Sequence, residues 1–147
     1  MTEHFANQRT IRVAIGSNGD DLVAVKTATN GTGRAAIERE VLVLTQLNHP
    51  NLVELVRTEE NEESTTMVTQ FAGRTTLAKV GPLDASAVAR IGAALLTIVR
   101  EIHDMGWVHG RLTEEHCIIG AGGRITLCAL GAAHRADAAL LAHEGRV

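Results

Sequence analysis

The chain has 147 residues and a formal net charge of -3, and a chain of this length ordinarily forms one domain with a buried core. With no basic run and only two Phe and one Trp, it lacks both the positive surface and the stacking side chains that nucleic-acid binding requires. We therefore expect no nucleic-acid partner.

No segment of the sequence points to a membrane or to secretion. No apolar run approaches the length of a bilayer, and Met1–His4 begins no secretory signal, so we expect a cytoplasmic protein without membrane contact. Cys117 and Cys128 are then expected to be free thiols, because disulfides are uncommon in that compartment.

Two strands and a helix are predicted in the first third of the chain. Residues 10–15 and 22–27 alternate apolar and polar side chains on either side of a turn at 18–21, which is typical of an antiparallel hairpin. After residues 30–33, apolar residues recur at helical spacing, namely Ile37, Val41, Leu44 and Leu47. This periodicity predicts a helix from Arg34 onward.

Two further strands are predicted around an acidic turn. Residues 52–57 and 66–71 flank the sequence 59–63, whose four glutamates favour a solvated tip. Together with the first hairpin they predict an antiparallel sheet of four or five strands.

A long helix is predicted in the second half of the chain. Asp84 or Ser86 can cap a helix of about 20 residues, which carries the apolar stripe Val88, Ile91, Leu95, Ile98 and Ile102. A hairpin between Cys117 and Cys128 follows, and residues 132–143 are rich in Ala and Leu and predict a last helix. The fold class is therefore α+β.

The segment 109–131 resembles the active site of protein kinases. His109-Gly110-Arg111-Leu112 and His116 stand at the spacing of the family's H-R-D-L-x-x-x-N, and Ala129-Leu130-Gly131 stands at that of its D-F-G. In that family the first Asp accepts the proton of the substrate hydroxyl, and the Asn and the second Asp bind Mg²⁺. The resemblance implies a pseudokinase of the Hanks-type Ser/Thr kinase family, with Arg111, His116 and Ala129 at the three chemical positions.

Two upstream segments resemble the same family. Leu22–Lys26 resembles the V-A-I-K strand, whose lysine pairs with the phosphates of ATP, and residues 40–53 resemble the αC helix and the H-P-N-I-V turn after it. The resemblance implies that Lys26 and Glu40 form the family's Lys–Glu ion pair.

The resemblance covers roughly residues 10–133 and implies one truncated kinase-like domain. Residues 1–72 would form the small lobe, with an antiparallel sheet and a helix, and 73–147 a partial, helical large lobe that ends just after the D-F-G equivalent. The family's glycine loop over the ATP phosphates has no counterpart before Lys26, and the A-P-E motif is absent after Gly131.

The replaced residues argue against phosphotransfer. Ala129 offers no ligand, Arg111 stays charged and cannot accept a proton, and the single imidazole of His116 is a poor ligand for Mg²⁺. We therefore expect no catalytic residue, no bound metal and no cofactor, with His109, Leu130 and Gly131 as remnants of the motif. The intervals between His103, His109 and His116 do not favour a zinc site either.

Two functions follow as hypotheses. In kinases a central helix covers the long helix, and this chain has no counterpart of that central helix. We therefore expect the apolar stripe of the long helix, together with Leu140 and Leu141, to bind protein. The chain would act without catalysis, as a homodimer or as a regulator of a true kinase or another signalling partner. Alternatively, it would sense ATP or another adenine ligand through Lys26 and Glu40, although these residues favour a structural salt bridge.

Overall fold

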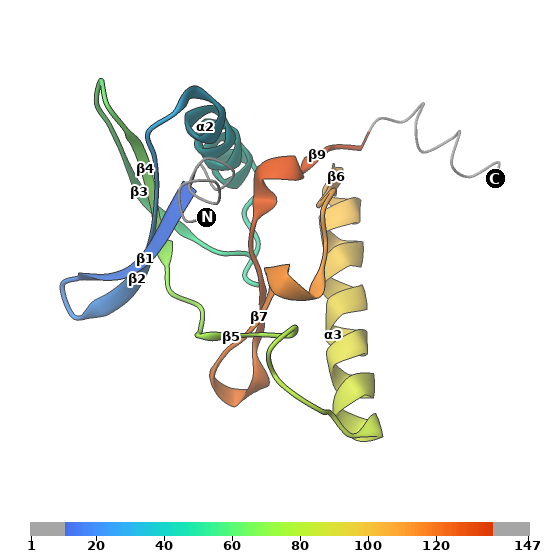
Figure 1. Cartoon of the computed structure of the whole chain (residues 1–147). Coiled ribbons are helices and arrows are strands. Elements are labelled where there is room, and N and C mark those ends of the chain that lie inside the picture. Colours follow the sequence, from blue (N-terminus) through green and yellow to red (C-terminus); the bar gives the residue numbers. More distant parts are fainter. Residues whose placement is uncertain (1–10, 137–147) are drawn as a thin grey trace, which may run out of the picture. The chain divides into compact units, whose positions relative to one another are not determined.

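The computed structural model describes residues 11–136, and the chain divides into two compact units, Met1–Ala72 and Gly73–Val147. Figure 1 shows the long helices α2 (Gly31–Gln46) and α3 (Ala85–Asp104), which belong to the first and the second unit respectively. Within residues 11–136, none of the helices combines the length and the apolar character that crossing a membrane requires.

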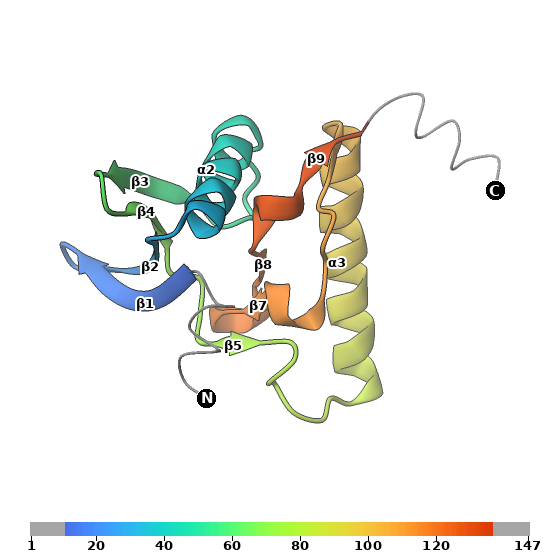
Figure 2. The ribbon, with the colours of Figure 1, turned by 45° about the horizontal axis from the view of Figure 1, so that its top comes forward.

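In its described part, residues 11–72, the N-terminal unit is a four-stranded antiparallel sheet with α2 packed on it. Its strands are β1 (Ile11–Asn18), β2 (Asp21–Ala28), β3 (Leu55–Glu60) and β4 (Thr65–Gln70), in the order β1-β2-β4-β3. Figure 2 shows α2 beside the sheet, where it contacts β2 and β4. The antiparallel sheet with one helix confirms the expected α+β class for this unit.

Helix α2 begins at Gly31 and not at Arg34, because Asn30 caps it. The Asn30 side-chain oxygen accepts a hydrogen bond from the backbone N–H of Gly33 at 2.8 Å, which satisfies one of the unpaired donors of the first turn. The buried face of α2 carries Ile37, Val43 and Glu40. The predicted start of this helix at Arg34 was therefore too late.

Strand β3 begins at Leu55, later than predicted, because the chain first makes a turn. The N–H of Leu52 donates to the carbonyl of His49 at 3.1 Å, and the N–H of Asn51 donates to Nδ1 of His49 at 3.0 Å. These bonds hold residues 49–52 out of the sheet.

Arg34 joins the first turn of α2 to the acidic hairpin. Its guanidinium donates to the hydroxyl of Thr65 and to the carbonyls of Glu62 and Asn61, each at 3.0 Å, and lies 3.6 Å from the carboxylate of Glu60. The tip of the β3–β4 hairpin is thereby attached to the helix.

In its described part, residues 73–136, the C-terminal unit is built on α3 and five short strands. Strands β5 (Thr75–Thr76), β7 (Cys117–Ile119) and β8 (Ile125–Leu127) form one sheet, and β6 (Trp107–Val108) pairs with β9 (His134–Arg135). Short 3₁₀ turns cover Glu114–His116, Ala121–Gly123 and Leu130–Ala132. Helix α3 has the predicted length, and Asp84 caps it by accepting from the N–H of Ala87 at 2.7 Å.

The helix predicted over residues 132–143 is wrong in its described part. Residues 134–135 instead form strand β9, which pairs with Trp107 and Val108. The Arg135 guanidinium lies 5.1 Å from the centre of the buried Trp107 ring, so a cation–π contact and two strand residues hold the segment extended. The remaining residues of this prediction, including Leu140 and Leu141, lie outside the described residues.

Candidate functional site

Lys26 and Glu40 form an ion pair in the N-terminal unit. Lys26 Nζ on β2 lies 2.7 Å from Oε1 and 3.3 Å from Oε2 of Glu40 on α2. The lysine side chain is 23% exposed and the glutamate side chain 7%. The pair therefore links the helix to the sheet from a largely buried position, and both carboxylate oxygens already face the lysine.

His109 ties together the two ends of the kinase-like motif in the C-terminal unit. Its Nδ1 accepts from the N–H of Arg111 at 3.2 Å, so Nε2 of the neutral ring carries the hydrogen and donates to the carbonyl of Cys128 at 2.9 Å. The buried ring thus fixes Arg111 and the residue before Ala129 relative to each other.

His116 is also tied to the backbone of this loop. Its Nδ1 lies 2.6 Å from the carbonyl oxygen of Arg111 and donates to it. The ring stacks on His109 with the centroids 6.1 Å apart, whereas His103 lies exposed near the end of α3. Residues 11–136 contain no group of three His, Cys, Asp or Glu side chains that could hold a metal ion.

Ala129 has an unusual backbone conformation at the position of the second chemical Asp. Its φ of 59° and ψ of 57° are left-handed, a region that residues other than glycine seldom adopt. Its methyl side chain offers no ligand. Leu130, the next residue, is fully buried and begins a 3₁₀ turn with Gly131, so this segment is packed into the unit.

Gly110 occupies the position of the arginine in the H-R-D motif, and its neighbours leave no room for a side chain. Its φ is +83°, and a Cβ there would overlap the carbonyl oxygen of Ala132. The loop and the 3₁₀ turn at residues 130–132 therefore approach each other more closely than a side chain at residue 110 allows. Sequence reasoning missed this contact, since the chain shows only that residue 110 is glycine.

Cys117 and Cys128 are both free thiols. Cys117 pairs in register with Leu127 across the β7–β8 hairpin, and its side chain is buried. Burial raises the pKa of the Cys117 thiol, because the thiolate loses its hydration there.

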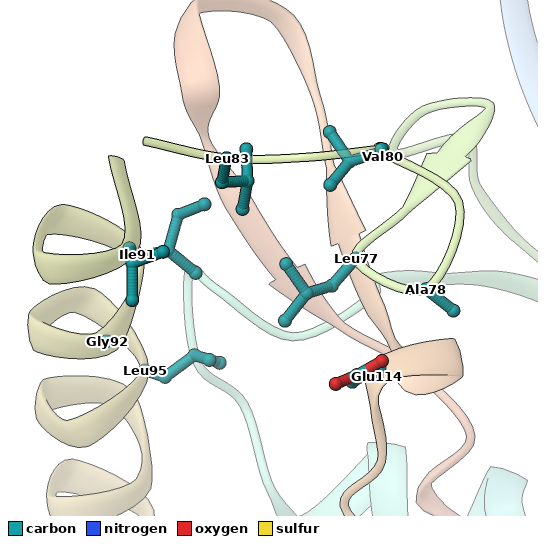
Figure 3. Close-up of a pocket in the computed structure, with 10 residues that line it drawn as sticks. Leu77, Ala78, Val80, Leu83, Ile91, Gly92, Leu95 and Glu114 are labelled. Carbon is teal, nitrogen blue, oxygen red and sulfur yellow. The ribbon is translucent and has the colours of Figure 1, made fainter. Parts of the chain in front are cut away.

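A groove of about 510 Å³ opens between α3 and the chain segment before it. Figure 3 shows aliphatic side chains on both walls and Glu114 at one end. The lining residues are Leu77, Ala78, Val80, Gly81, Leu83, Val88, Ile91, Gly92, Leu95 and Glu114. Sequence reasoning missed the wall formed by residues 77–83, because an irregular segment has no hydrophobic period to detect.

The groove divides the predicted stripe of α3 into two halves. Val88 is 55% exposed, and together with Ile91 and Leu95 it lines the groove. Ile98 and Ile102 are buried because α3 packs on β6 and β8 at that end. The proposal of Ile98 and Ile102 as interface residues is therefore wrong, since neither is accessible.

A sequence model described as the protein kinase domain matches residues 10–143. The chain belongs to the protein kinase domain family.

Curated relatives carry the same family name. The chain is 27% identical over 98 residues to Serine/threonine-protein kinase 36 of Pongo abelii, covering 65% of this chain and 8% of that protein. It is 29% identical over 124 residues to Serine/threonine-protein kinase PEPKR2 of Arabidopsis thaliana, covering 75% and 26%. It is 34% identical over 87 residues to Serine/threonine-protein kinase RAD53 of Saccharomyces cerevisiae, covering 56% and 11%. The chain thus spans only a minor part of the length of each relative.

Proposed function

We propose that this kinase-family chain is a catalytically inactive pseudokinase that acts by binding protein. The proposal rests on the side chains at the three chemical positions of the family's motif, which are Arg111, His116 and Ala129. Phosphoryl transfer needs a carboxylate near the substrate hydroxyl and oxygen ligands for Mg²⁺, and these three side chains offer a guanidinium, an imidazole and a methyl group.

The packing of the loop supports the same proposal. The hydrogen bond from His116 Nδ1 to the Arg111 carbonyl uses one of the two ring nitrogens. A side chain at Gly110, where the family's H-R-D motif has arginine, would overlap the carbonyl oxygen of Ala132. This backbone arrangement therefore leaves no room for the family's arginine.

The part of the α3 stripe that lines the groove, Val88, Ile91 and Leu95, supports the proposal that the chain binds protein. An apolar groove with exposed aliphatic residues at its rim is typical of an interaction site. A small ligand would fill only the groove, whereas exposed Leu96, which is not among the residues that line the groove, extends the apolar surface along the helix. A protein partner would cover both.

The proposed catalytic inactivity is tested by a phosphotransfer assay. The full chain is incubated with radiolabelled ATP and either Mg²⁺ or Mn²⁺, alone and with generic protein substrates. We expect no labelled protein above the level of the chain with Lys26→Ala. Transfer that occurs with the natural chain and disappears in Lys26→Ala would show that the chain is an active kinase.

The Lys26–Glu40 pair favours one alternative function, a nucleotide-sensing switch without phosphotransfer. The pair is intact at 2.7 Å, and the family's lysine contacts ATP phosphates. In this alternative, ATP or another adenine ligand would stabilise the chain without being consumed. A rise in melting temperature with ATP that is lost in Lys26→Ala would favour it over simple protein binding.

A further inference from the structure

The sheet of the N-terminal unit has two edge strands of opposite character. Strand β3 forms one edge and β1 the other (Figure 2). The pairing of β3 with β4 shifts between Leu55 and Arg57, and β3 exposes the charged side chains of Arg57, Glu59 and Glu60. An irregular register and charged side chains are features that keep another strand from adding to a sheet edge. The β3 edge is therefore protected.

Strand β1 lacks both of these features. It pairs with β2 through all of its residues without a shift in register, and its sequence, IRVAIGSN, contains no proline and a single charged residue, Arg12. Val13 is 64% and Ile15 47% exposed, and the two side chains share one face because they stand two residues apart. A long, regular and apolar edge of this kind is open to a further strand. Within residues 11–136, β2 is the one strand that pairs with β1.

The backbone of β1 directs alternate residues toward the open edge. The carbonyl of Leu22 accepts a hydrogen bond from the N–H of Phe71 at 3.2 Å, so Leu22 directs its backbone groups toward β4. This direction alternates along a strand, so Val23 turns toward β1 and meets its register partner Gly16. The same alternation then runs along β1 from Gly16. The residues whose N–H and C=O groups face away from β2 are Ile11, Val13, Ile15 and Ser17.

A second β1 strand matches these four residues when it runs antiparallel to the first. With Ala14 opposite Ala14 of the other copy, Val13 faces Ile15. Ile11 then faces Ser17, and each of these facing pairs exchanges two hydrogen bonds. A shift by two residues would leave an outward residue without a partner, so this register uses the edge most fully. A contact in which residue i meets residue j and j meets i has two-fold symmetry.

We propose that the occupant of the β1 edge is a second copy of the chain, whose β1 joins the two sheets into one. This pairing covers both unprotected edges, so the joined sheet ends at a protected β3 strand on each side and assembly stops at the dimer. A strand from another protein would itself become a new edge. Arg12 faces Gly16 in this register, so no like charges meet.

The inference rests on the proposed protein binding and specifies a partner for it. It uses a different surface from the α3 groove, because β1 belongs to the N-terminal unit and the groove to the C-terminal unit.

The first test is the molar mass of the full chain in solution at tens of micromolar, measured by light scattering. We expect a dimer for the natural chain and a monomer for Ile15→Pro. Proline removes an N–H that faces away from β2, and such positions on edge strands tolerate proline. The monomer therefore loses no hydrogen bond of its own sheet, and the variant should keep its far-ultraviolet circular dichroism.

The second test changes a side chain and leaves the backbone donors in place. Ile15→Lys should also be monomeric, because its ammonium group would lie against Val13 of the other copy. Leu22→Lys is the matched control. Leu22 is 48% exposed and lies on the same face as Ile15, since its register partner is Ser17, but it belongs to β2 and not to the edge. This variant should remain a dimer.

The third test locates the two-fold axis by cross-linking. Ala14→Cys should form a disulfide between two copies under mild oxidation, because facing Cα atoms in a pair without hydrogen bonds lie about 4.5 Å apart, within the range of a disulfide. Arg12→Cys should not, since the two copies of residue 12 would lie about 14 Å apart along the strands. Non-reducing electrophoresis measures the cross-linked dimer. Both variants retain the natural thiols of Cys117 and Cys128, which give the same background.

Three results would overturn the inference: a monomeric natural chain, a dimer that Ile15→Pro leaves intact, or cross-linking of Arg12→Cys as efficient as that of Ala14→Cys. A dimer that Val88→Glu separates and Ile15→Pro does not would assign the contact to the groove instead. None of these measurements depends on phosphotransfer. A monomer without kinase activity would reject the dimer alone, whereas a dimer that phosphorylates protein would reject the proposed inactivity alone.

Discussion

Nδ1 of His116 lies 2.6 Å from the carbonyl oxygen of Arg111, so the residue at the family's metal-binding Asn position is hydrogen-bonded to the residue at its catalytic Asp position. The bond uses the backbone carbonyl of Arg111 and ties these two positions of the loop to each other.

Replacing His116 with Ala should lower stability by about 1 kcal/mol, the usual net contribution of one hydrogen bond. For a chain of this size that corresponds to a fall of roughly 3 °C in melting temperature. Thermal unfolding followed by circular dichroism measures the change, with His103→Ala as the control on the exposed end of α3. Equal effects of the two substitutions would show that the His116 bond contributes nothing.

Replacing Gly110 with Ala should destabilise the chain by at least about 2 kcal/mol, because the Cβ adds both left-handed strain and overlap with the Ala132 carbonyl. Gly122 is the control. It also has a positive φ, of 68°, but a Cβ there meets no atom within 4 Å, so Gly122→Ala should cost only about 1 kcal/mol. Chemical denaturation gives both values, and similar losses would show that the loop can move away from Ala132.

Replacing Lys26 with Met should destabilise the N-terminal unit by about 2 kcal/mol, because it leaves the largely buried Glu40 carboxylate without its cation. The double variant Lys26→Met with Glu40→Met should recover much of this loss, since no buried charge remains. Lys79→Met, at an exposed lysine, should change stability little. A double variant that is less stable than Lys26→Met alone would contradict this account.

Millimolar ATP with Mg²⁺ should leave the melting temperature unchanged if the Lys26–Glu40 pair is structural. A ligand that binds only the folded chain adds about 2.7 kcal/mol at a concentration one hundred times its dissociation constant, which a melting assay detects readily. The same measurement with AMP identifies an adenine site that does not require the β- and γ-phosphates. Stabilisation by either nucleotide would make the nucleotide-sensing function the stronger proposal.

Cys117 should react with iodoacetamide more slowly than Cys128 in the folded chain. Burial limits access to Cys117, and its raised pKa leaves less thiolate at neutral pH, so its labelling should accelerate as the pH rises. Mass spectrometry of digested samples measures both sites, and in denaturant the two rates should become equal. Faster labelling of Cys117 in the folded state would contradict its burial in the β7–β8 hairpin.

Local signals in the sequence predicted the parts of the fold that depend on neighbouring residues. The Asp84 cap and the apolar period predicted α3, and the motif spacing brought His109, Arg111 and His116 into one loop. The predicted helix over 132–143 was wrong in its described part because the Trp107 partner of Arg135 is distant in the sequence. The groove was not predicted for a similar reason, because its second wall, residues 77–83, depends on how an irregular segment folds back on α3.

The guanidinium of Arg34 has a consequence for how the N-terminal unit can move. Its three hydrogen bonds to the β3–β4 hairpin hold the first turn of α2, while Glu40 holds the next turns to β2 through Lys26. An outward swing of this helix would have to break both attachments at the same time. The helix therefore opens cooperatively or not at all, and its amide hydrogens should exchange with solvent together with those of the acidic hairpin.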